Sequence, residues 1–295
     1  MSPSLIEIVI LSIVQGAAEP LPVSSSAHVI AAERIMRLDP SSPQMTFLLA
    51  MLHTGTVIAV VAYFWRSWRR TFFASPGQLR ETAGRLFWAT FATLCVYLVL
   101  EQLIKRTLLH GRPGAQVEDL FSNAPLVAAA LAAGGALILY SGLRERRAGA
   151  PGGGAAAPGG PVPAAAAAWI GAIQGLVVPF RGLSRSGATI SAGMLLGVDR
   201  RVSEEFSFAL AVVITPPVIV RELLRYYRER AAHAAQVDMA SLLAPGLVGM
   251  ACSFVAGLLA LRWLSGWLAA GRWHYFGAYC LAAAVAFLAL SRLGY

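Results

Sequence analysis

The sequence predicts an all-α polytopic membrane protein that is built from two inverted-topology repeats. Only 13% of its 295 residues are charged and 57% are hydrophobic, whereas an average soluble domain carries about 25% charged residues. Six apolar runs are long enough to be read as membrane spans, since a spanning helix needs about 20 residues. In addition, the second half of the chain repeats the polar and apolar pattern of the first half.

Each repeat is expected to contain one re-entrant helix hairpin followed by three transmembrane helices. The first repeat covers 1–147 and the second covers 164–295, and a flexible linker rich in Ala, Gly and Pro joins them at 148–163. The re-entrant hairpins are predicted at about 5–36 and 165–196. The spans are predicted at about 45–64, 86–104, 124–143, 205–224, 243–264 and 273–290.

The first hairpin is predicted from a short apolar run that ends in a proline-containing break. Leu5–Val14 is too short to cross a bilayer, and Pro20 and Pro22 end its helix. The serines at 24–26 offer N-caps for a second helix. Residues 172–190 follow the same order of Gln-Gly, proline and hydroxyls. Such breaks are tolerated at membrane depth only where they are buried in protein or line a cavity.

The spacing of the repeats and the basic loops predict the orientation of the chain. Gln15 matches Gln174, and Thr54 matches Thr215, at offsets of 159 and 161 residues. Three spans per repeat is an odd number, so the halves must insert with opposite orientation, as in many transporters. Basic clusters place the loops after the first and third spans in the cytoplasm. The two breaks then meet near mid-membrane and open to the extracytoplasmic side.

Three ionisable residues lie about midway along the apolar parts of the hairpins: Glu19, His28 and Arg185. An arginine at the bilayer centre costs about 2.5–3.5 kcal/mol. Any one of the three, taken alone, could be a snorkelling or pore-facing structural residue. Their occurrence in two matching breaks instead favours one shared functional site.

The predicted helices after the breaks begin with serines, which favours binding of an anion. A helix N-terminus presents free N–H groups and about half a positive charge. Two such termini together with Arg185 suit a phosphate group. The simpler role of N-capping remains open for at least one of the serines at 24–26.

The chemistry expected at this site is phosphoryl transfer. Ser25 and His28 share one helix face, and either could take a phosphoryl group while the other assists proton transfer. Glu19 could act as a base or, with Gln15, as a ligand for a divalent cation. His53 either lies near this site or only forms a hydrogen bond to a neighbouring helix.

Two long motifs carry a resemblance to a known family. They are Gln15-x-x-x-Glu19 with Pro22-Val23-Ser24-Ser25-Ser26-Ala27-His28, and Gly182-Leu183-Ser184-Arg185-Ser186-Gly187-Ala188-Thr189. In this order they resemble the signature motifs of the bacterial undecaprenyl-diphosphate phosphatase family, and the resemblance covers nearly the whole chain. The family consists of inner-membrane enzymes with inverted repeats. They remove the terminal phosphate from undecaprenyl diphosphate, recycle the lipid carrier of cell-wall synthesis, and need a divalent cation.

The resemblance and the residue chemistry together give the expected site. The catalytic residues are Glu19, Ser25, His28 and Arg185, and the substrate-binding residues are Ser24, Ser26, Ser184, Ser186, Gly187, Thr189 and Arg181. Glu19 and Gln15 are the expected ligands of Mg²⁺ or Ca²⁺. The chain departs from the family pattern at Gln15, which is the neutral option there, at Ala27, and at Arg181, where the family normally has proline.

The expected partners are a polyprenyl diphosphate lipid, the bilayer of the bacterial inner membrane, and a second copy of the chain in a homodimer. Nucleic acid is not expected despite the net charge of +9, because no basic domain exists outside the apolar segments. The alternative function is a transporter or flippase of a phosphorylated lipid, since inverted repeats are typical of transporters. The spacing Lys105-x6-Arg112-Pro113 opens the motif of type 2 phosphatidic acid phosphatases, but the rest of that motif is absent.

Overall fold

The computed structural model describes residues 3–39, 42–107, 123–147, 160–232 and 239–292. These residues form ten α-helices and no strand. The helices are α1 (Leu5–Ala18), α2 (Ser25–Ile35), α3 (Pro43–Thr71), α4 (Pro76–Thr107), α5 (Ala124–Arg147), α6 (Ala164–Val177), α7 (Arg185–Leu195), α8 (Arg200–Ala232), α9 (Met239–Ala269) and α10 (Trp273–Arg292). The expected all-α fold is therefore confirmed.

Six of these helices are long and apolar enough to cross a membrane: α3, α4, α5, α8, α9 and α10. Each contains most or all of one predicted span, so the multi-pass membrane prediction is confirmed. The predicted bounds were too short for α3 and α4, because hydropathy marks the apolar segment and not the helix ends. Ser75 shows the reason at α4: its hydroxyl accepts a hydrogen bond from Gln78 N and caps a polar first turn.

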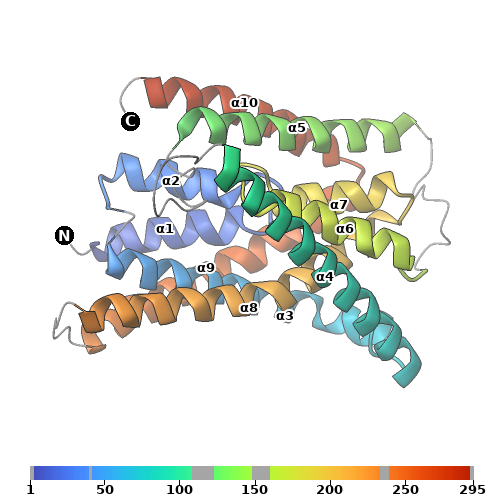
Figure 1. The fold of residues 1–295 in the computed structure, drawn as a ribbon, viewed down its shortest axis with the longest axis horizontal. Coiled ribbons are helices and arrows are strands. Elements are labelled where there is room, and N and C mark those ends of the chain that lie inside the picture. The colour runs from blue at the N-terminus through green and yellow to red at the C-terminus, as the bar shows by residue number, and fades with distance from the viewer. Residues whose placement is uncertain (1–2, 40–41, 108–122, 148–159, 233–238, 293–295) are drawn as a thin grey trace.

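The four short helices form two pairs between the long ones (Figure 1). In this view α5 and α10 run side by side along the top, α3, α8 and α9 lie below, and α4 crosses the front. The helix α1 packs against α2 and α9, and α6 packs against α7 and α4. The chain therefore reverses direction twice inside the molecule, once between α1 and α2 and once between α6 and α7.

Glycines allow several long helices to approach closely. A Cβ added at Gly135 of α5 would lie 2.9 Å from Cys280 Cβ of α10, and one at Gly277 would run into the backbone at Leu139. Close approach through small residues is typical of helices that associate in membranes. The α5–α10 pair is therefore a firmly packed unit beside the short helices.

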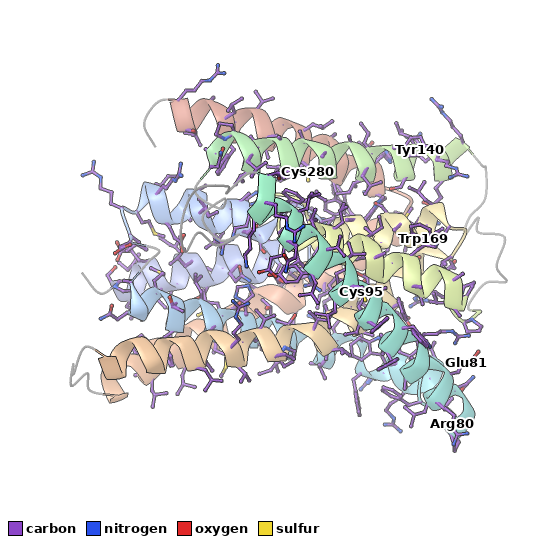
Figure 2. The ribbon with its side chains drawn as sticks, in the orientation of Figure 1. Arg80, Glu81, Cys95, Tyr140, Trp169 and Cys280 are labelled. Carbon is purple, nitrogen blue, oxygen red and sulfur yellow. The ribbon has the colours of Figure 1, made fainter. Side chains whose placement is uncertain are left out.

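Large apolar side chains cover the outer surface, as a lipid-facing bundle requires. Figure 2 shows Tyr140 of α5 and Trp169 of α6, whose exposed fractions are 59% and 61%. The helix α4 is the least buried of the six candidate spans, and it exposes Phe87, Trp88 and Phe91. These surfaces agree with a bilayer as the surrounding solvent.

Candidate active site

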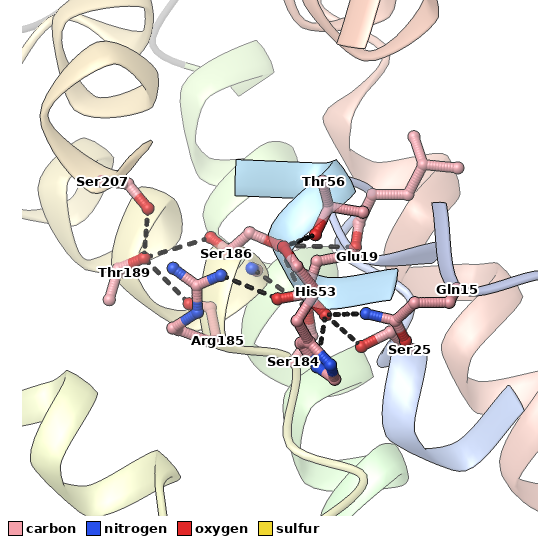
Figure 3. A network of polar contacts seen from close by, with 12 residues as sticks. Gln15, Glu19, Ser25, His53, Thr56, Ser184, Arg185, Ser186, Thr189 and Ser207 are labelled. Atoms are coloured by element: carbon pink, nitrogen blue, oxygen red, sulfur yellow. Dashed lines mark hydrogen bonds and ion pairs between the residues drawn. The ribbon is translucent and has the colours of Figure 1, made fainter. Parts of the chain in front are cut away.

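The structure brings the two breaks together. The first break lies between α1 and α2, and the second lies between α6 and α7. Arg185 Nη2 donates a hydrogen bond of 3.0 Å to Glu19 Oε1, and Ser186 Oγ donates one of 3.3 Å to Leu21 O. Figure 3 shows Glu19, Ser25 and Arg185 in one continuous polar network. Residues about 166 positions apart in the chain thus share one site.

Glu19 is the centre of this network. Its Oε2 atom accepts hydrogen bonds from Ser25 Oγ at 2.6 Å and from Gln15 Nε2 at 3.1 Å, while Oε1 accepts the bond from Arg185. His53 Nε2 lies 3.9 Å from Oε2. A carboxylate that accepts a short hydrogen bond from a serine hydroxyl has the geometry of a general base next to its nucleophile.

Arg185 has one guanidinium nitrogen without a partner. Among the described residues, its Nη1 atom is buried and donates a hydrogen bond to no protein acceptor, while Nη2 donates to Glu19. Buried donors in native proteins are nearly always satisfied, so an orphaned donor calls for a ligand. A phosphate oxygen is a suitable acceptor, because guanidinium groups bind phosphate with two N–H groups in a planar fork.

The two helices that start at the breaks differ at their N-termini. At α7, Ser184 Oγ accepts a hydrogen bond of 3.2 Å from Gly187 N and caps the helix. At α2, Ser24 forms no side-chain cap bond, and its hydroxyl instead lies 3.2 Å from Ser26 Oγ. The first N–H groups of α2 therefore lack a side-chain cap and can bind an anion.

Ser24 has a strained backbone. Its φ is 66° and its ψ is 90°, in a region that residues other than glycine rarely adopt. Such a conformation costs on the order of 1–3 kcal/mol and clusters at active sites, where the surrounding structure enforces it. The strained residue directly precedes Ser25, the residue bonded to Glu19.

Three of the expected substrate-binding residues contact other parts of the protein around the site. Thr189 is fully buried, and its hydroxyl bonds to Arg185 O at 2.8 Å and to Ser207 Oγ at 2.6 Å. A Cβ at Gly187 would lie 2.6 Å from Ile138 Cδ1, so this glycine permits close packing. Arg181 lies near enough to Glu33 of α2 for their charges to interact. These contacts give the three residues structural partners within the protein.

The two histidines near the site, His28 and His53, have different surroundings. His28 points to Tyr279 of α10, with Nε2 2.7 Å from the phenol oxygen, and its Nδ1 lies 2.9 Å from Ser24 O. His53 Nδ1 lies 2.8 Å from Leu49 O of its own helix, and its other nitrogen faces Glu19. Sequence reasoning left His53 open and missed Tyr279 altogether, because nothing in the apolar pattern of α10 distinguishes this tyrosine.

The residues present do not fit a preformed cation cage. Gln15 turns its amide nitrogen to Glu19, and both carboxylate oxygens of Glu19 already accept protein hydrogen bonds. In the described part of the chain, no group of three or more His, Cys, Asp or Glu side chains converges on one point. Divalent cations such as Mg²⁺ and Ca²⁺ instead need several oxygen ligands around a shared centre.

Fold and site together define a polytopic membrane protein with a half-buried serine–carboxylate–arginine centre suited to a phosphate group. Residues 8–286 match the family model described as bacitracin resistance protein BacA, and the chain belongs to this family.

Individual relatives match over almost their full lengths. The chain is 50% identical to undecaprenyl-diphosphatase 2 of Acinetobacter baylyi over 280 residues, which cover 94% of this chain and 95% of the relative. It is 31% identical to the undecaprenyl-diphosphatase of Moorella thermoacetica over 286 residues, 94% of each chain. It is 30% identical to that of Korarchaeum cryptofilum over 285 residues, 95% of this chain and 97% of the relative.

Proposed function

We propose that this protein hydrolyses undecaprenyl diphosphate, or a related polyprenyl diphosphate, to the monophosphate and inorganic phosphate. This reaction recycles the lipid carrier of cell-wall synthesis. Family membership and relatives named undecaprenyl-diphosphatase support the proposal. The single observation that carries it is the Ser25–Glu19–Arg185 network, in which a hydroxyl, a base and an unsatisfied guanidinium nitrogen lie together.

The substrate phosphate binds at Arg185 Nη1 and at the uncapped N-terminus of α2. The two features provide positive charge near Ser25, and they stabilise the charge that develops on the transferring phosphoryl oxygens. The prenyl chain remains in the surrounding lipid along the apolar helices.

Ser25 is the nucleophile that the geometry favours over His28. Its Oγ forms the bond to the terminal phosphorus while Glu19 accepts the hydroxyl proton, and the bond from phosphorus to the bridging oxygen breaks. Polyprenyl monophosphate leaves with the electron pair of that bond. Glu19 releases this proton to solvent and then deprotonates a water molecule, whose oxygen forms a bond to phosphorus while the bond from phosphorus to Ser25 Oγ breaks. Inorganic phosphate leaves, and Glu19 returns the proton of the water to Ser25 Oγ. His28 is less suited to attack because contacts to Ser24 O and Tyr279 occupy both ring nitrogens.

The assay for this function measures phosphate release from purified protein. Prenyl diphosphates of several chain lengths are the substrates, and a prenyl monophosphate is the matched control, since it lacks the anhydride bond. Release of one phosphate per diphosphate and none from the monophosphate is expected. A protein that binds the diphosphate without hydrolysing it would instead indicate a transporter or flippase of phosphorylated lipids.

The role of a divalent cation rests on the family resemblance alone. We propose that activity depends on Mg²⁺ or Ca²⁺ with Glu19 and Gln15 as its ligands, which would require these two side chains to release the hydrogen bond between them. Loss of phosphate release in a chelator, followed by recovery on adding one of the two ions, is the expected result. A homodimer is likewise proposed, and light scattering of the purified protein measures its mass.

The inverted-repeat architecture is proposed for α1–α5 and α6–α10, with repeats at 1–147 and 164–295. The short helices α1 and α6 have 14 residues each, which corresponds to about 21 Å and is less than the roughly 30 Å of a bilayer core. Matched contacts support the repeat: α1 packs against α9 as α6 packs against α4. Most of the linker at 148–163 lies outside the described residues.

A further inference from the structure

His28 is held at both ring nitrogens. A carbonyl oxygen can only accept a hydrogen bond, so the contact to Ser24 O requires the proton on Nδ1. In the neutral ring, Nε2 is then an acceptor, and Tyr279 donates its hydroxyl proton to it at 2.7 Å. The two rings also lie nearly parallel, with 13° between their planes and 5.8 Å between their centroids.

Tyr279 is placed by the packed α5–α10 unit. Its neighbour Cys280 is fully buried against Gly135 of α5, and the Cys280 thiol donates to Pro22 O in the first break at 3.1 Å. Two consecutive residues of α10 therefore contact the first hairpin: Cys280 contacts the break itself, and Tyr279 contacts α2 just after it. This arrangement fixes the phenol hydroxyl relative to α2, which begins just after the same break.

The contact between Tyr279 and His28 is linked to Ser25, the serine bonded to Glu19, through two further interactions. His28 Nδ1 donates to the carbonyl of Ser24, the residue whose φ of 66° needs support from its surroundings. The orientation of that peptide sets where Ser25 begins α2 and how its hydroxyl meets Glu19. A rigid ring at position 28 therefore helps to hold the strained turn in place.

We propose that Tyr279 is a positioning residue for the active site, acting through His28 on the Ser24–Ser25 turn. Nothing in the sequence motifs assigns a role to this tyrosine. The inference rests on the proposed phosphatase function, but its structural part, the hydrogen bond from Tyr279 to His28, is measurable without any activity.

The test variant is Tyr279→Phe, which keeps the ring and removes only the hydroxyl. About a three- to tenfold lower kcat is expected from the loss of one hydrogen bond, with an unchanged KM, because Tyr279 acts on the turn and not on the substrate. Tyr140→Phe is the matched control, since Tyr140 points away from the bundle on α5 and is 59% exposed (Figure 2). This control should retain normal kcat and KM.

The second readout is the ¹⁵N NMR signal of the His28 ring in histidine-labelled protein, which contains only five histidines. The His28 signal is assigned by its loss in His28→Asn. Tyr279→Phe should shift the Nε2 resonance, and Tyr140→Phe should leave it in place. A normal kcat in Tyr279→Phe, a rise in KM alone, or an unmoved Nε2 resonance would each overturn the inference.

The two proposals fail in different ways. A wild-type protein that releases no phosphate, yet shows the Tyr279-dependent shift of His28, would overturn the phosphatase function and with it the positioning role. A wild-type protein that is active, with a Tyr279→Phe variant equally active, would overturn only the role of Tyr279.

Discussion

At the scale of single residues, the site depends on one carboxylate that serves three donors. Glu19 accepts hydrogen bonds from Gln15, Ser25 and Arg185 with its two oxygens. Only Arg185 among the three donors carries a charge, so their removal should have different consequences.

Replacing Arg185 by lysine should lower kcat/KM at least 100-fold. A guanidinium group can bond Glu19 with one nitrogen and a phosphate oxygen with the other, whereas an ammonium group is a single point charge. Arg200→Lys is the matched control, because Arg200 pairs with Glu145 at 3.6 Å outside the Glu19 network. Phosphate release by the two purified variants is compared at equal amounts of folded protein. Near-normal turnover of Arg185→Lys would remove this residue from phosphate binding.

Replacing Glu19 by glutamine should lower kcat by about 10²–10⁴-fold, the usual contribution of a general base. Gln15→Ala removes only one neutral donor and should cost about tenfold or less. Kinetics of both variants, with their thermal melting as a check on folding, provide the comparison. A larger loss of kcat in Gln15→Ala than in Glu19→Gln would show that the roles proposed for these two residues are wrong.

At the scale of helices, the apolar pattern of the sequence predicts the membrane spans but misses some of the helix ends. Apolar length predicted all six spans, because this signal is local and follows from the bilayer thickness. Proline and serine clusters likewise marked the ends of α1 and the start of α2. The polar first turn of α4 was missed, since its helix continues beyond the apolar segment.

The contacts between side chains within the site were harder to predict from the sequence. The approach of Glu19 to Arg185 could be expected, because opposite charges in two matching breaks attract one another. Tyr279 is 251 positions from His28, and its contact depends on how tightly α5 and α10 pack. No local pattern carries such information, so the environment of His28 required the structure.

The close packing of α5 and α10 predicts how a substitution at their contact changes the stability of the protein. Gly277→Ala should lower the melting temperature of the purified protein, because the new methyl group meets the backbone of α5 at Leu139 and overpacking costs about 1–3 kcal/mol. Gly84→Ala is the matched control, since a Cβ at Gly84 of α4 has no neighbour within 4 Å. This control should hold or raise the melting temperature, because alanine is the better helix former. Equal behaviour of the two variants would contradict a close α5–α10 contact.

At the scale of the whole molecule, the two breaks are enclosed differently. The helix α7 packs against both α5 and α8. Eight of the eleven residues of α7 are buried, whereas only three of the eleven residues of α2 are buried. The site is therefore more open on the side of α2 than on the side of α7. In the proposed topology, the side of α2 faces away from the cytoplasm.

The basic helix ends are the observation on which this orientation rests. The last turn of α3 carries Arg69 and Arg70, and the last turn of α5 carries Arg144, Arg146 and Arg147. Both ends should lie in the cytoplasm by the positive-inside rule. In this proposed topology the segment between α2 and α3 lies outside, and we expect a polyprenyl diphosphate to reach Arg185 from the outer leaflet.

Single cysteines at Ser41, between α2 and α3, and at Ser75, between α3 and α4, test this orientation. The background lacks the native Cys95, Cys252 and Cys280. On intact spheroplasts, a membrane-impermeant thiol reagent should label position 41 and leave position 75 unlabelled. After permeabilisation both positions should react, which controls for accessibility. Labelling of position 75 alone on intact cells would invert the topology, so the side of α2, and with it the more open face of the site, would be cytoplasmic.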